Sequence, residues 1–160
     1  MKRLLLFLIC LGVLFFASCK NTSTDGIEQF FNQTTVVFET SGVKYQYNDP
    51  DQTFLVINGD FSGMSLCFVN NECIVSFKEF RINTDPRVFP QLKEFLSLFD
   101  AYKNNADAAV INDQNAYALL IDSSRFLVYY NSDICKVHKL VADTESGSFE
   151  YKVIDSEDIN

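Results

Sequence analysis

The chain has 160 residues, with 13 lysines and arginines against 21 aspartates and glutamates and a formal net charge of −8. An acidic chain repels phosphates and attracts basic proteins and cations, so nucleic acid is not an expected partner. Sixteen phenylalanines and seven tyrosines, without a tryptophan, predict an interior packed largely by aromatic rings.

Residues 1–19 have the three parts of a bacterial secretory signal. Lys2 and Arg3 supply positive charge, residues 4–16 form an unbroken apolar run, and Ala17-Ser18 are small residues suited to cleavage. The run is too short to span a bilayer, which needs about 20 apolar residues. An ordinary secretory signal that a cysteine follows by chance would share these features.

The segment Phe16-Ala17-Ser18-Cys19 resembles the lipobox of bacterial lipoproteins, although that family usually has leucine where Phe16 stands. The resemblance implies that Cys19 is acylated with fatty acids such as palmitate and anchors the chain in a lipid bilayer. It also implies an outer-membrane location facing the periplasm, because Lys20 rather than aspartate follows the cysteine; surface display stays open. No family resemblance is evident for residues 20–160.

The domain organisation follows from this signal. Cleavage removes Lys2 and Arg3, so 13 basic residues become 11 against 21 acidic ones, and the formal charge becomes −10. The mature chain has the usual size of one domain. We expect a signal peptide at 1–18, a lipidated tether at 19–25, one globular domain at 26–154 and an acidic tail at 155–160.

The first half of the domain reads as one short helix followed by strands. Ile27, Phe30 and Phe31 lie on one side of a helix within residues 26–32. Alternating or continuous apolar runs then predict strands, separated by turn signals at Ser41-Gly42, at Asn58-Gly59 and between residues 69 and 72. These expected strands are 34–39, 43–47, 54–57, 64–69 and 73–82, the last with a bulge between Phe77 and Phe80.

Residues 88–104 form the strongest predicted helix. Leu92, Phe95 and Phe99 recur on one face, Lys93 and Glu94 fall opposite, and a proline at position 90 fits the first turn. Further strands are expected at 116–121, 126–130, 136–141 and 149–154. The predicted fold is α+β: one domain with an antiparallel, meandering sheet, the main helix on one face and a short N-terminal helix.

Three mature cysteines remain besides the acylated one: Cys67, Cys73 and Cys135. A three-residue loop at 69–71 would place Cys67 opposite Cys73 and permit a disulfide, which we expect. A two-residue loop at 70–71 would pair Cys67 with Ile74 instead and put the two thiols on opposite faces. A bridge from Cys135 to either residue also stays open, as does a set of three reduced thiols.

Catalytic and metal-binding patterns are incomplete. Residues 63–67 match four of the five positions of a nucleophile elbow around Ser65, but strand patterns surround them and the second glycine is missing. Cys135 and His138 are three positions apart, and on a strand residues at this spacing point to opposite faces, so they could not pair there. A single histidine excludes histidine-rich zinc sites. We therefore expect no catalytic residue, cofactor or metal.

These features together favour a membrane-anchored envelope lipoprotein that acts as a binding module. The acidic charge suggests a basic envelope protein as its partner, besides the lipid bilayer that Cys19 enters. Two further functions stay open. One is an envelope enzyme whose acidic catalytic residues meet only in three dimensions, and the second is a structural lipoprotein.

Overall fold

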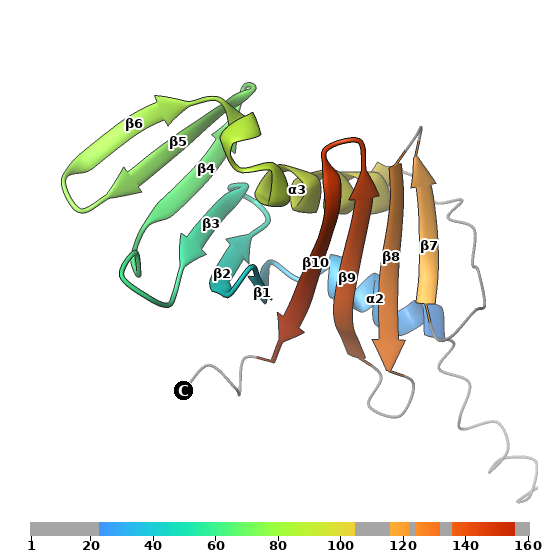
Figure 1. The fold of residues 1–160 in the computed structure, drawn as a ribbon. Helices are drawn as coiled ribbons and strands as arrows, with labels where there is room; N and C mark the ends of the chain where they lie inside the picture. Colours follow the sequence, from blue (N-terminus) through green and yellow to red (C-terminus); the bar gives the residue numbers. More distant parts are fainter. Residues whose placement is uncertain (1–22, 105–115, 122–123, 132–135, 156–160) are drawn as a thin grey trace, which may run out of the picture.

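The computed structural model describes residues 23–104, 116–121, 124–131 and 136–155. These residues form helices and one antiparallel sheet of ten strands (Figure 1). In chain order the elements are α2 (Ser23–Phe31), β1 (Thr35–Thr40), β2 (Val43–Asn48), β3 (Thr53–Val56), β4 (Ser65–Val69), β5 (Glu72–Phe77), β6 (Phe80–Thr84), the 3₁₀ helix η1 (Pro86–Val88), α3 (Pro90–Asn104), β7 (Ala116–Ile121), β8 (Ser124–Asn131), β9 (Lys136–Thr144) and β10 (Gly147–Ile154).

The sheet consists of two meanders joined by strands from opposite ends of the chain. Its order is β6-β5-β4-β3-β2-β1-β10-β9-β8-β7. Sequence neighbours pair within β1 to β6 and within β7 to β10, and the pairing of β1 with β10 connects the two halves. The structure thus has the predicted α+β character, with a meandering antiparallel sheet and one main helix, although strands dominate it.

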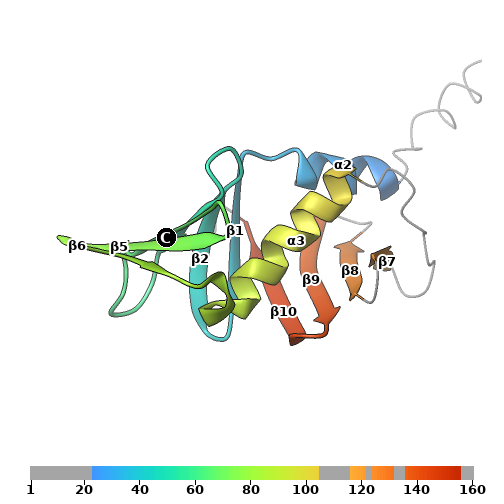
Figure 2. The ribbon, with the colours of Figure 1, turned by 90° about the horizontal axis from the view of Figure 1, so that it is seen from above.

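Both α-helices pack on the same face of this sheet, which we call the inner face (Figures 1 and 2). Side chains alternate along each strand, so every second residue points inward. The inward residues of the first four strands are buried and largely aromatic. They are Val36, Phe38, Tyr45, Tyr47, Phe54, Val56, Leu66 and Phe68.

Helix α3 buries the predicted apolar stripe against these rings. Leu92, Phe95 and Phe99 are almost completely inaccessible to solvent, which confirms the predicted face. The helix begins at Pro90, two residues later than expected, because η1 forms the preceding turn. The placement of Glu94 on the exposed side was wrong, since this residue is only 7% exposed.

The bulge expected between Phe77 and Phe80 is a hairpin turn instead. β5 and β6 are separate strands, paired from Phe77 with Phe80 to Cys73 with Thr84. Lys78 has a φ of 54°, which a two-residue turn requires at this position. A slip in alternation has the same sequence pattern in a bulge and in a tight turn, so the pattern could not separate them.

The predicted disulfide between Cys67 and Cys73 is wrong. Asn70 and Asn71 have φ values of 51° and 62° and form a two-residue turn, so Cys67 pairs with Ile74 and Phe68 with Cys73. The two thiols therefore lie on opposite faces, and both are free. Burial raises the pKa of Cys73 to about 11, which keeps this thiol protonated and unreactive at neutral pH. Cys135 lies outside the described residues.

The N-terminal helix is longer than expected. α2 begins at Ser23, inside the segment predicted as a tether, and buries Ile27, Phe30 and Phe31 as predicted. Gly26 permits its close approach to β8, because a Cβ atom at this position would lie 2.4 to 2.8 Å from ring atoms of buried Tyr130. No helix in the described part of the chain is long and apolar enough to cross a membrane.

Candidate binding cleft

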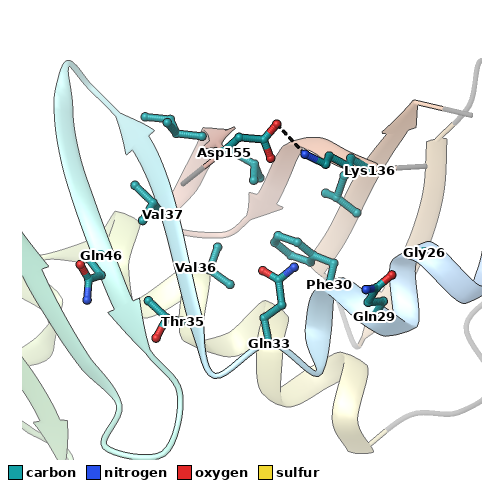
Figure 3. A pocket seen from close by; sticks show the side chains of 13 residues that line it. Gly26, Gln29, Phe30, Gln33, Thr35, Val36, Val37, Gln46, Lys136 and Asp155 are labelled. Atoms are coloured by element: carbon teal, nitrogen blue, oxygen red, sulfur yellow. Dashed lines mark hydrogen bonds and ion pairs between the residues drawn. The ribbon is translucent and has the colours of Figure 1, made fainter. Parts of the chain in front are cut away.

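A cleft opens beside the paired part of β1 and β10, where the two halves of the sheet separate. β1 starts at Thr35, but its register with β10 covers only Val37 to Glu39. The register of β10 with β9 likewise ends at Lys152. The ends of β1, β9 and β10 therefore spread apart, and α2 lies beside the gap (Figure 3). We call this space, about 710 Å³ in volume, the seam cleft.

The seam cleft has a mixed lining of apolar side chains and polar groups, amides among them. Its apolar residues come from the helix and all three strands: Phe30, Val36, Val37, Val137, Val153 and Ile154. The uncharged polar residues are Gln29, Gln33, Thr35 and Gln46. Clefts that bind small molecules usually combine about 300 to 1,000 Å³ of space with mainly apolar walls and a few polar groups. The seam cleft has such a volume, and apolar and polar groups contribute to its walls in similar measure.

The charges at the cleft compensate each other. Lys136 and Asp155 are the charged lining residues, and their side chains form an ion pair of 2.9 Å across one side of the opening (Figure 3). Both side chains are about half exposed, so the pair contributes at most about 1 kcal/mol to stability. Because the lining that the described residues form has no net charge, it favours an uncharged ligand over an ion.

Hydrogen bonding to a ligand would come from glutamine amides. Gln29 and Gln33 come from α2 and the residues just after it, and both are exposed. Gln29 and Gln33 line the same cleft as the half-buried Val153 and Ile154 (Figure 3). An amide offers both donors and an acceptor, so one ligand could contact these apolar residues with an apolar part and an amide with a polar part.

The residues weighed in the sequence for catalysis are not brought together. Ser65 begins β4 and His138 lies on β9, with β3, β2, β1 and β10 between these strands in the sheet. His138 is exposed at the irregularity between β8 and β9. Within the described ranges no group of three or more histidine, cysteine, aspartate or glutamate residues could hold a metal ion.

The predicted lipidation residue, Cys19, lies outside the described residues. The seam cleft is a site that the sequence analysis did not predict. Its glutamines look like ordinary exposed positions when read along the chain. Its walls come from residues 26–46 and 136–155, which only the folded sheet brings together. Asp155, read as the start of a tail, belongs to this site.

Comparisons with known proteins add little to this description. No family model and no curated protein match the chain. Among solved structures it is similar to the crystal structure of the Mycobacterium tuberculosis lipoprotein LppX, with 12% sequence identity and a TM-score of 0.39. The similarity covers 82% of this chain and 89% of that one. A TM-score this low assigns neither a shared fold nor a shared function.

Proposed function

We propose that this protein is a membrane-anchored binding protein of the bacterial cell envelope, which holds a small, uncharged ligand with apolar and polar parts in the seam cleft. The observation that carries the proposal is the cleft itself, with its mixed apolar and polar walls, its amides and its compensated ion pair. The ligand's apolar part would contact the half-buried Val153 and Ile154, and its polar part would meet Gln29 or Gln33.

The expected lipid anchor supports an envelope location and places the cleft near the membrane. Cys19 and Ser23 are four residues apart in the sequence, and a fully extended chain spans about 3.3 to 3.6 Å per residue. The start of α2 would therefore lie within about 14 Å of the acylated cysteine. Gly26, in the first turn of α2, lines the cleft. With Lys20 after the cysteine, we place the protein at the outer membrane, facing the periplasm.

A neutral fluorescent dye tests the proposal. We expect N-phenyl-1-naphthylamine to bind the unacylated polypeptide 20–160 saturably, with a rise in fluorescence. Ile154→Arg should weaken this binding by about tenfold or more, because a long charged side chain would occupy the apolar cleft at a high desolvation cost. Ile154 is only half-buried at the end of β10, so the fold should tolerate the change.

Val69→Arg is the matched control, since Val69 is an exposed apolar residue on β4, remote from the lining. It should bind the dye as the parent does, and thermal melts should show that both variants are folded. Equal dye affinity in the parent and in a folded Ile154→Arg variant would disprove the proposed site.

A basic envelope protein remains a second candidate partner, on the charge argument alone. On the outer face of the sheet several charges meet opposite charges on neighbouring strands: Glu39 lies opposite both Lys44 and Lys152, and Arg125 lies opposite Asp143. Such pairs reduce the local field that a basic partner would meet. We therefore rank the seam cleft above the charge-based partner.

A further inference from the structure

All exposed large apolar side chains of the described residues lie in one stretch of the chain. They are Phe61, Val69, Phe80, Ile82 and Val88. In Figures 1 and 2, β5 and β6 extend past the end of α3. The helix therefore leaves the inner face of these strands uncovered, and solvent reaches side chains that would otherwise be core.

Three of these residues and one neighbour form a continuous apolar surface, which we call the wing surface: Phe61, Phe77, Phe80 and Ile82. Phe80 pairs with Phe77 across the hairpin, and the rings of Phe61 and Phe77 are 6.1 Å apart. Phe80 is 75% exposed and Ile82 is 60% exposed. Apolar residues grouped in this way are typical of interaction sites.

The wing surface adjoins a free sheet edge. Among the described residues, β6 is the last strand in the order and pairs only with β5. The two-residue turn between β5 and β6 is closed by the pair Phe77 and Phe80. The backbone N–H and C=O groups of residues 80, 82 and 84 therefore form hydrogen bonds with β5. The backbone groups of Arg81 and Asn83 consequently point away from the sheet. An exposed apolar edge strand of this kind is a template for pairing with another strand.

We propose that β6 pairs antiparallel with β6 of a second copy of this chain, with Ile82 opposite Ile82. In this register Arg81 of each copy faces Asn83 of the second copy. The N–H and C=O groups of Arg81 and Asn83, four outward backbone groups on each strand, therefore all form hydrogen bonds. Ile82 contacts Ile82 directly, and Phe80 is its diagonal neighbour across the pair, which extends the wing surface over both copies. The resulting interface is self-complementary, as a twofold dimer requires.

Charge favours this occupant and this register. The charged residues around the edge are three acids and three bases: Glu72, Glu79, Asp85, Lys78, Arg81 and Arg87. The edge around β6 therefore carries no net charge, in contrast to the −10 expected for the mature chain. A register centred on Arg81 would place the guanidinium groups of the two copies opposite each other. In the register centred on Ile82, Arg81 lies opposite the uncharged side-chain amide of Asn83. At the end of the pair Glu79 meets Asp85, whose charge Arg87 already compensates.

Cysteine cross-linking in the full chain tests the register. Ile82 would form a non-hydrogen-bonded pair with its copy, where Cα atoms approach to about 4.5 Å and a disulfide can form. We expect Ile82→Cys to give a covalent dimer on a non-reducing gel when membranes of the expressing cells are treated with a mild oxidant, at about ten times the parent's level or more. Arg81→Cys, an exposed neighbour on the same strand that faces Asn83, should stay at the parent's level.

Ile82→Lys supplies a second readout. It should abolish the dimer in sedimentation of the detergent-solubilised full chain, leave the circular dichroism spectrum of the folded chain unchanged because the side chain is exposed in one copy, and leave dye binding in the seam cleft intact. The proposal is overturned if Ile82→Cys yields no dimer, if Arg81→Cys cross-links equally, or if the Ile82→Cys product joins this chain to a different protein.

Discussion

Replacing Phe95 with alanine is expected to remove about 3 to 5 kcal/mol of unfolding free energy, a large part of the roughly 5 to 15 kcal/mol that stabilises a domain of this size. Phe95 is completely buried, and its ring lies at the centre of the aromatic core. It stacks on Phe38 at 4.1 Å and Phe99 at 4.9 Å, and it meets Tyr47, Phe54 and Tyr151 at larger angles. Truncation would leave a cavity that these rings cannot all move to fill.

Denaturant unfolding of the parent and the variant measures this loss. Lys93→Ala is the control, because Lys93 is exposed on the same helix and its replacement should change stability by less than about 0.5 kcal/mol. Similar losses for the two variants would show that the rings around Phe95 do not carry the core in the way that the structure indicates.

Cys19→Ala is expected to abolish the incorporation of labelled palmitate. The physical basis is the acyl chains that the lipobox resemblance implies, since each buried CH₂ contributes about 0.8 kcal/mol and two chains anchor a protein stably. When the Cys19→Ala chain is exported behind an ordinary cleaved signal in place of residues 1–18, it should leave the membrane fraction. No described helix could span the bilayer in place of the acyl chains.

Metabolic labelling and cell fractionation measure both effects. Cys67→Ala is the matched control: it removes a half-buried mature cysteine and should keep the label and the membrane location of the parent. Label that persists in Cys19→Ala, or that the parent never acquires, would refute the lipoprotein interpretation.

Local patterns in the sequence determined most of the secondary structure. Apolar residues three and four apart are sufficient to define a helix face, so Leu92, Phe95 and Phe99 were placed correctly before any tertiary contact was known. Turn residues with positive φ, such as Ser41 and Gly42, likewise define hairpins between neighbouring strands. These features depend on residues a few positions apart, which is why they can be predicted from one sequence.

The tertiary structure decided what the local patterns left open. Whether Asn70-Asn71 closes a two- or three-residue loop sets the register, and a shift of one residue moves every side chain to the other face, so the Cys67–Cys73 bridge failed. Glu94 is buried because α3 packs on the inner face of the sheet. The spacing of apolar residues along the helix does not specify how much of its surface that packing covers.

The pairing of β1 with β10, the first and last strands of the domain, creates the seam cleft, and the position at which α3 ends leaves the wing surface open. Long-range pairing depends on how all the elements pack together, and no short segment of the sequence encodes it.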